Sequence, residues 1–155
     1  MNLKLILYDF DGVMTNNKLF LFEDGKEAVI LNRSDGLAVS YINKLNIEQA
    51  IVSTEENKVV TKRGKKLNIK TYQNIENKLQ FVKEIIINKK ISPEEVAFIG
   101  NDLNDLELIK FIPNSFCPKD SHPKVLKASK TVLNKKGGNG VIMAFFNFLE
   151  RENNG

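Results

Sequence analysis

Residues 3–15 read LKLILYDFDGVMT, an apolar run that ends in an acidic loop. The run at residues 3–8 predicts a buried β-strand. Asp9 and Asp11 follow it, and two residues apart on an extended chain they project to the same side. Two carboxylates there are unfavourable unless a cation lies between them, and Mg²⁺ prefers oxygen ligands. Gly12 lets backbone amides approach a phosphate. The stretch therefore predicts a magnesium site for phosphate chemistry.

The rest of the chain alternates between strand and helix patterns. Further strands are expected at residues 47–53, 69–72, 96–100, 115–117 and 131–133. Helices are expected from a cap at Ser34 or Asp35 to residue 45, up to residue 67, at 75–88, up to residue 110, at 122–128 and at 141–149. This alternation predicts an α/β fold: a three-layer, Rossmann-like parallel sheet with helices on both faces and ligands at the carboxyl ends of its strands.

Residues 19–31 predict a β-hairpin, because Asp24-Gly25 is a strong tight-turn signal between two apolar runs. Phe20 and Phe22 on this ribbon either pack internally or bury in an oligomer interface. We expect one domain over residues 1–150 and a frayed tail at residues 151–155.

Composition limits the function classes. The chain has 155 residues, 42% hydrophobic and 27% charged, which is ordinary for a soluble globular domain. No apolar run approaches the roughly 18 residues of a membrane span. A single cysteine, Cys117, is expected in the core and fits a reducing cytoplasm. The net charge is +4, but the lysines are spread along the chain, so no nucleic-acid partner is expected. The densest basic cluster, residues 62–66, predicts a solvated helix face or, alternatively, a groove that attracts an anionic metabolite.

Three more polar clusters follow strands or open helices on the same predicted edge. They are Ser53-Thr54-Glu55, Lys78, and residues 100–105, which read GNDLND. Ser53 is interpreted as a helix cap, a phosphate ligand or both, because helix starts bind anions. Lys78 has the alternative of a solvated helix lysine.

In order, spacing and strand context these clusters resemble the phosphatases of the haloacid dehalogenase superfamily. The resemblance implies that Asp9 is a covalent nucleophile and that Asp11 protonates the leaving oxygen and then activates water. It implies Mg²⁺ held by the Asp9 carboxylate, the Asp11 backbone carbonyl and the Asn101 side chain.

The same resemblance assigns the remaining site residues. Ser53 would bind the transferring phosphoryl group, with Gly12 and Thr54 beside it. Lys78 would neutralise the charge of that group and orient Asp9. Two further acidic residues, Asp102 and Asp105, would complete or support the metal site.

The resemblance narrows to capless members with a hairpin, which act on 3-deoxy-octulosonate 8-phosphate or on nine-carbon, sialic-acid-type sugar 9-phosphates. Residues 51–57, 100–105, 120–123 and 137–140 carry it. It implies a homotetramer through the hairpin, and a cytidylyltransferase as a further partner. Asn101 replaces the usual metal-binding aspartate, and Met143 stands where relatives have an arginine. A substrate carboxylate contact would then come from elsewhere, with Arg33 and Lys119 as candidates.

Some assignments stay open. Glu55 either binds a sugar hydroxyl or favours the first turn of its helix, and Asp35 is either a helix cap or a substrate contact. His122, before a proline, predicts a turn or interface role. One rival function is a weak phosphatase-like assembly domain for an acylneuraminate cytidylyltransferase. The other is a phospho-acceptor signalling domain, although there the acceptor aspartate follows a middle strand, where this chain has Ser53.

Overall fold

The computed structural model describes residues 1–154, whose centre is a six-stranded parallel sheet. Its strand order is β5-β4-β1-β6-β7-β8, and the hairpin β2-β3 forms a separate antiparallel pair. The strands are β1 Leu5–Tyr8, β2 Phe20–Leu21, β3 Glu27–Ala28, β4 Glu48–Val52, β5 Lys70–Tyr72, β6 Val96–Ile99, β7 Asn114–Pro118 and β8 Thr131–Leu133. The helices are α1 Arg33–Asn43, α2 Lys58–Leu67, α3 Lys78–Lys89, α4 Leu106–Phe111, α5 Pro123–Ala128 and α6 Val141–Asn154, with short 3₁₀ turns η1 Pro93–Glu95 and η2 Leu103–Asp105.

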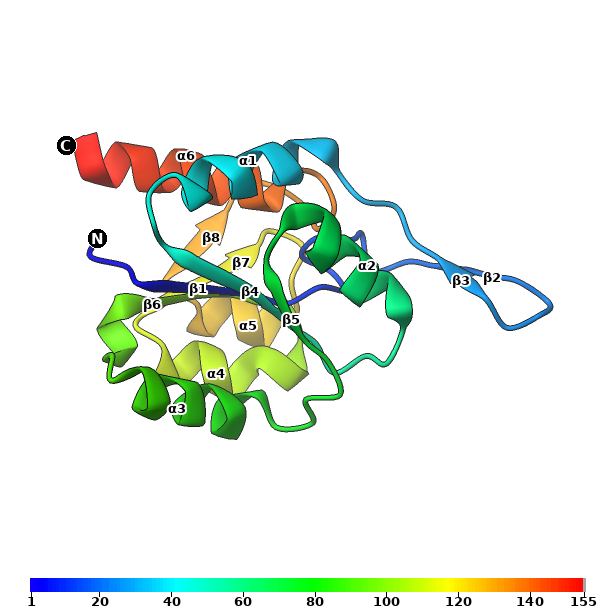
Figure 1. Cartoon of the computed structure of the whole chain (residues 1–155), viewed down its shortest axis with the longest axis horizontal. Helices are drawn as coiled ribbons and strands as arrows, with labels where there is room; N and C mark the ends of the chain where they lie inside the picture. The colour runs from blue at the N-terminus through cyan, green and yellow to red at the C-terminus, as the bar shows by residue number, and fades with distance from the viewer. Residues whose placement is uncertain (155) are drawn as a thin grey trace.

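Two layers of helices cover the sheet, so the predicted three-layer α/β fold is confirmed (Figure 1). Strand β1 alternates: Ile6 and Tyr8 pack in the core that α1, α2 and α6 complete, whereas Leu5 and Leu7 pack on the side of α3, α4 and α5. All four side chains are buried, which explains why the strand reads as a continuous apolar run.

The strand order places the candidate site. From β1 the chain crosses to β4 and β5 on one side, and it then returns to β6 on the other side of β1. This switch point opens a crevice at the carboxyl ends of β1, β4 and β6, where ligands of such sheets bind. The hairpin leaves the body at this same end (Figure 1).

Three helices begin at an asparagine cap. The side chains of Asn32, Asn57 and Asn77 accept hydrogen bonds from the backbone at the starts of α1, α2 and α3. The predicted cap at Ser34 or Asp35 is therefore wrong, because Asn32 already satisfies the backbone N–H of Ser34 at 2.9 Å. The helix predicted from residue 75 begins at Lys78 instead.

Two other expectations need correction. Helix α6 continues to Asn154, so most of the tail predicted as frayed is helical, while Gly155 lies outside the described residues. In the basic cluster at residues 62–66, Arg63 is buried and its guanidinium donates to the Asn32 carbonyl at 3.1 Å. Within the described chain, no helix is both long enough and apolar enough to cross a membrane.

Candidate active site

Asp9 is the first residue after β1 and lies at the centre of the crevice. Its backbone N–H donates to the Ile99 carbonyl at 2.9 Å. This hydrogen bond extends the parallel pairing of β1 with β6 by one residue beyond Tyr8. Its side chain is only 7% exposed. Its Oδ1 accepts a hydrogen bond from Lys78 Nζ at 2.6 Å.

Lys78 joins the carboxylates of Asp9, which follows β1, and Asp105, in the 3₁₀ turn η2 after β6. As the first residue of α3 it is fully buried, and its Nζ also donates to Asp105 Oδ1 at 2.7 Å. Asp105 in turn accepts from the backbone N–H groups of Asn101, at 2.9 Å, and Asp102, at 3.3 Å. The alternative of a solvated lysine is therefore excluded, and the chain from Asp9 through Lys78 to Asp105 orients the Asp9 carboxylate.

The electrostatics of this trio follow from its burial. Burial raises the pKa of Asp9 to about 7, the neighbouring Asp105 carboxylate adds to the rise, and Lys78 opposes it. Burial alone would lower the pKa of Lys78, but the two carboxylates outweigh it and hold that pKa above the ordinary lysine value. The trio holds two carboxyl groups for one ammonium group, so an additional cation beside Asp9 would stabilise its ionised form.

The surroundings of Asn101 fit a divalent cation. The terminal amide of Asn101 lies 2.9 Å from Asp9 Oδ2 and 2.8 Å from the Asp11 carbonyl oxygen, and turned one way its Nδ2 donates to both. Turned the other way, its oxygen joins a carboxylate oxygen and a carbonyl oxygen, which is the donor chemistry that Mg²⁺ takes. Among residues 1–154 no cluster of three or more His, Cys, Asp or Glu groups suited to a metal occurs. A metal at this position would therefore need the Asp11 backbone carbonyl and the Asn101 side-chain amide as ligands in addition to the Asp9 carboxylate.

The loop after Asp9 requires its glycine. Gly12 has a φ of +86°, and a Cβ at this position would overlap the Asn101 side chain. Its N–H donates to Thr15 Oγ1 at 3.2 Å, which holds the loop in a tight turn. Because Gly12 has no side chain, this loop lies directly against Asn101. The two candidate metal ligands in the loop, the Asp9 carboxylate and the Asp11 carbonyl oxygen, are therefore close to the Asn101 amide.

Ser53 is the first residue after β4, the strand that pairs with β1. It is buried, its Oγ accepts from the N–H of Glu55 at 3.1 Å, and its own N–H donates to the Tyr72 carbonyl. Ser53 therefore shapes the turn before α2, whose N-cap is Asn57. Thr54 is half-buried in the same turn.

A hollow of about 180 Å³ lies beside Asp11, and Glu55, Asn57 and Lys18 also line it. Glu27 of the hairpin completes it, with Oε2 accepting from Asn57 Nδ2 at 2.5 Å. Burial raises the pKa of the Asp11 carboxyl, and the charges of Glu55 and, more weakly, Glu27 add to that rise. The hollow offers several hydrogen-bonding groups to a hydroxyl-rich leaving group.

Three predicted site residues lie apart from this cluster. Asp35 is 1% exposed and caps α6, accepting from the backbone N–H groups of Ile142 at 3.0 Å and Met143 at 3.3 Å. The predicted capping of its own helix is therefore wrong, and Asp35 caps α6 instead. Arg33 lines a separate hollow of about 650 Å³ between α1 and α2. Asp102 is exposed and caps η2, accepting from Leu103 N–H at 2.7 Å.

Sequence reasoning missed residues that hold the Glu55 turn. Gln73 Nε2 donates to the carbonyls of Glu55, at 3.1 Å, and Asn57, at 2.8 Å. No sequence pattern singles out Gln73, whereas Asn57 precedes a helical pattern and could have been found as a cap. His122 acts as the N-cap of α5, which agrees with its predicted turn role, and Cys117 is buried as predicted.

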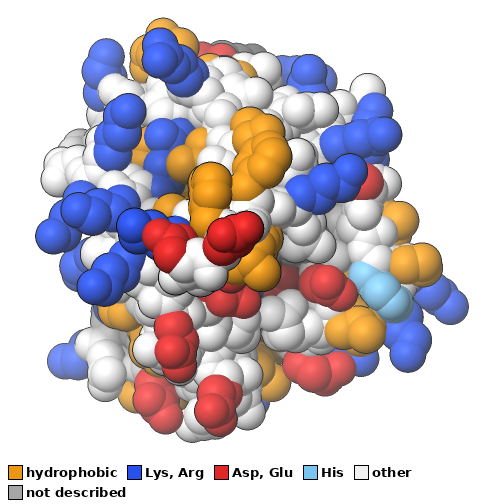
Figure 2. Space-filling model, turned by 90° about the vertical axis from the view of Figure 1, so that its right-hand side faces the viewer, with side chains coloured by type: hydrophobic (Ala, Val, Ile, Leu, Met, Phe, Trp, Pro, Cys, Tyr) orange, Lys and Arg blue, Asp and Glu red, His pale blue; other side chains and the backbone are white. Residues whose placement is uncertain are grey.

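Figure 2 shows the molecule from the side on which the hairpin projects. Hydrophobic and acidic side chains gather near the middle of this face, Lys and Arg side chains lie mainly above them and to the sides, and Asp and Glu side chains continue below. The Lys and Arg side chains above and beside the middle can steer an anionic substrate toward the crevice.

The chain resembles known proteins along most of its length. A family profile described as haloacid dehalogenase-like hydrolase matches residues 37–145. The 3-deoxy-D-manno-octulosonate 8-phosphate phosphatases of Yersinia pestis and of Escherichia coli K12 are each 30% identical over 142 residues, which cover 91% of this chain and 76% of theirs. The solved structure of the Yersinia pestis phosphatase superposes with a TM-score of 0.90 at 28% identity and covers 97% of this chain and 83% of that one. The predicted phosphatase class is thereby confirmed, and the chain belongs to the haloacid dehalogenase-like hydrolases.

Proposed function

We propose that this phosphatase hydrolyses an acidic sugar phosphate, of the class of 3-deoxy-octulosonate 8-phosphate or a nine-carbon, sialic-acid-type sugar 9-phosphate. The observation that carries the mechanism is the pair of buried hydrogen bonds by which Lys78 links Asp9 to Asp105. The substrate class is supported by the activity named for the 30% identical relatives. The product would enter the synthesis of a surface carbohydrate.

In the first chemical step an Asp9 carboxylate oxygen attacks phosphorus while the bond from phosphorus to the sugar oxygen breaks. Asp11 gives its proton to that leaving oxygen, and its raised pKa favours the protonated form that this needs. In the second step Asp11 takes a proton from water, whose oxygen attacks the same phosphorus. Inorganic phosphate leaves, and the Asp9 carboxylate is restored.

Lys78 and the turn residues position the groups that react. Lys78 holds Asp9 in place at 2.6 Å and carries positive charge toward the phosphoryl oxygens. Ser53, with Thr54, would donate hydrogen bonds to the phosphoryl group, and Gly12, which has no Cβ, would let the loop backbone approach it. Glu55 would bind a hydroxyl of the leaving sugar in the hollow beside Asp11.

Mg²⁺ would be held by the Asp9 carboxylate, the Asp11 carbonyl and the Asn101 amide oxygen, which already converge. When bound, it would neutralise negative charge that develops on the phosphoryl oxygens. Asn101 contributes no charge where an aspartate would, so we expect weak metal affinity. Asp105 would not bind the metal itself but would hold Asn101 in place by accepting a hydrogen bond from its backbone N–H.

The hairpin favours assembly into a homotetramer. Phe20, Leu21 and Phe22 are 60%, 70% and 55% exposed, and Leu19 and Ile30 are also more than half exposed. An apolar ribbon of this kind is stabilised when it packs against copies of itself, and a neighbouring copy would then help to close the crevice. Size-exclusion chromatography with light scattering would measure the mass, which should be four times 17.6 kDa.

A second candidate function is a weak phosphatase-like domain that assembles with a cytidylyltransferase. The observation that favours it is Asn101 in place of a charged metal ligand. This alternative predicts stable oligomers with no measurable Mg²⁺ binding.

Phosphate release from a panel of sugar phosphates, with Mg²⁺ or with EDTA, tests the proposal. We expect Mg²⁺-dependent release that prefers a keto-deoxy sugar acid phosphate over neutral hexose phosphates. Asp9→Asn is nearly isosteric and should abolish release without unfolding the protein. No release by the wild type from any acidic sugar phosphate would overturn the proposal and favour the assembly function.

A further inference from the structure

Three lysines from two loops line one hollow beside the active-site loop. Lys119 follows β7, and Lys135 and Lys136 follow β8. The hollow measures about 480 Å³, and three asparagines, Asn32, Asn134 and Asn139, complete its lining. No acidic residue lines it. We call these six residues the lysine pocket.

The two loops are tied together. The Lys119 N–H donates to the Lys135 carbonyl at 3.0 Å, and Lys119 Nζ donates to Asn134 Oδ1 at 3.1 Å. The nearest acid in sequence, Asp120, does not line the hollow and accepts from the Gly137 N–H at 2.9 Å. The backbones that carry the three ammonium groups are therefore held in register.

The lysine pocket is next to the catalytic loops. The Gly138 N–H donates to the Val13 carbonyl at 3.0 Å, and the His122 N–H donates to the Asn101 carbonyl at 2.9 Å. A Cβ on Gly137 would overlap the Gly12 carbonyl oxygen, so this loop lies directly on the turn after Asp9. The loops that carry the lysines thus contact both the nucleophile turn and the Asn101 turn.

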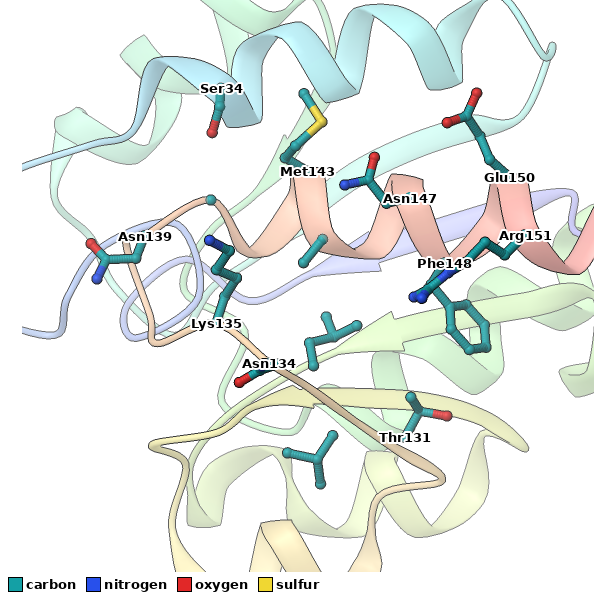
Figure 3. A pocket seen from close by; sticks show the side chains of 14 residues that line it. Ser34, Thr131, Asn134, Lys135, Asn139, Met143, Asn147, Phe148, Glu150 and Arg151 are labelled. Carbon is teal, nitrogen blue, oxygen red and sulfur yellow. The ribbon is translucent and has the colours of Figure 1, made fainter.

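The hollow continues into a larger groove. Asn134, Lys135 and Asn139 also line a groove of about 890 Å³ between β8 and α6. In Figure 3 the Lys135 side chain rises from its loop toward the start of α6, on the side where Met143 lies. A small molecule in the lysine pocket therefore has space to extend along α6.

Unpaired lysines usually lie free in solvent, but here they share one concave space. Across residues 1–154, no carboxylate lies within ion-pair distance of Lys119, Lys135 or Lys136. Ammonium groups that face one hollow repel one another, and an anion between them would reverse that repulsion. Asparagine amides can add neutral hydrogen bonds to the same anion.

We infer that the lysine pocket is a second anion-binding site, which takes the carboxylate or phosphate group of a small molecule. The anion has two possible sources. One is the carboxylate of the sugar acid substrate, and this source rests on the proposed function. The other is free inorganic phosphate, which does not depend on it.

Lysine acetylation followed by mass spectrometry tests the site without turnover. Acetic anhydride would be applied to the wild-type protein in EDTA, alone, with inorganic phosphate, and with 3-deoxy-octulosonate that carries no phosphate. We expect at least about threefold slower acetylation of the three pocket lysines with one or both probes. Lys124, Lys127 and Lys130 are exposed lysines elsewhere and should not change. Equal reactivity with and without both probes, or equal protection of the control lysines, would overturn the inference.

Kinetics then identify the source. The variant Lys119→Ala/Lys135→Ala/Lys136→Ala is compared with Lys124→Ala/Lys127→Ala/Lys130→Ala, which removes the same charge. If the substrate carboxylate binds here, the first variant raises KM for an acidic sugar phosphate about tenfold and leaves a neutral hexose phosphate unchanged. Unchanged KM for both, together with protection by phosphate, assigns the site to the free anion. If the wild type shows no phosphatase activity, the proposed function fails while the acetylation result still decides the inference.

Discussion

The buried trio of the active site and the hairpin differ sharply in their exposure to solvent. In the trio, Asp9, Lys78 and Asp105 bury three ionisable groups that satisfy one another within one chain. The hairpin, by contrast, exposes apolar side chains, with Leu21 70% exposed. The polar groups of the first region pair within a single copy, whereas the apolar side chains of the second face solvent. The comparison leads us to expect that the chemistry is built within one chain and, if the proposed tetramer forms, that a neighbouring copy helps to enclose the substrate.

The trio affects the stability of the single folded chain, whereas the hairpin affects association between copies. Burying charged groups costs free energy unless each is paired, so the trio is sensitive to the loss of any member. Exposed apolar side chains cost little in the isolated chain but favour association. Variants in the trio should therefore change turnover and folding, whereas variants in the hairpin should change assembly.

Replacing Lys78 should have the largest effect. Lys78→Met leaves Asp9 and Asp105 buried without a counter-charge, so we expect a loss of about 3–5 kcal/mol in the free energy of unfolding. Turnover should fall by at least about 10³-fold, because the nucleophile loses its orientation. Urea unfolding and phosphate release measure the two effects.

The matched control is Lys83→Met on the same helix, which should change both by little. Adding Asp105→Asn to Lys78→Met should restore part of the stability and none of the activity. A Lys78→Met protein with wild-type stability would show that the trio is not the charged core of the site.

The hairpin variant should change assembly without unfolding the domain. Phe20→Ser/Leu21→Ser removes two exposed apolar side chains that contact nothing in the sheet core. We expect light scattering to show a smaller assembly, with circular dichroism unchanged. Ile87→Ser is the control, because Ile87 is 72% exposed on α3, away from the hairpin. If the double variant keeps the wild-type mass, the hairpin does not carry the interface.

A charge change at Asn101 should have a moderate effect. Asn101→Asp adds a carboxylate next to Asp9 and the Asp11 carbonyl, so the Mg²⁺ concentration for half-maximal turnover should fall about tenfold. Asp102→Asn removes an exposed charge that caps η2 and serves as the comparison. An unchanged Mg²⁺ requirement in Asn101→Asp would place the metal elsewhere.

The residues that could be predicted share a local signal. Asp9, Asp11 and Asn101 follow apolar runs directly, and parallel strands bring their carboxyl ends to one edge, so the sequence alone placed them together. The strand and helix pattern placed Lys78 at the same edge, but only family resemblance gave its role, because nothing local distinguishes a buried lysine from a solvated one. Its burial depends on Asp9, which lies 69 residues away.

The residues that could not be predicted depend on distant partners. Asp35 looked like a cap for its own helix, but it caps α6, which begins more than 100 residues later. Arg63 looked like part of a solvated basic face, but the packing of α2 against the start of α1 buries it. Such contacts are tertiary, and neither periodicity nor spacing encodes them.

Asp35 should show the smallest effect, and it is visible in the pH dependence of stability. Burial raises its pKa from an ordinary 3.8 to about 6, against two backbone hydrogen bonds that lower it. Between these values the folded state binds more protons than the unfolded state, so its contribution to stability falls as pH rises from about 4 to 6. Asp35→Asn keeps a capping oxygen and removes this titration.

The free energy of unfolding of the wild type should therefore decline relative to Asp35→Asn by about 2 kcal/mol over that range. Urea titrations of both proteins at matched pH values provide the measurement. A constant difference between the two proteins would mean that Asp35 does not titrate in this window.

The central claim, that Asp9 is the nucleophile, is tested most directly by trapping its phosphorylated form. Asp11→Asn would be mixed with ³²P-labelled p-nitrophenyl phosphate and Mg²⁺ and quenched in acid, since this leaving group needs little help from an acid but the later water attack does. We expect a nitrophenol burst close to one per active site and label on the peptide that contains Asp9, with none in Asp9→Asn/Asp11→Asn. Turnover by the wild type without any labelled protein in Asp11→Asn, or label that persists when Asp9 is replaced, would contradict the account.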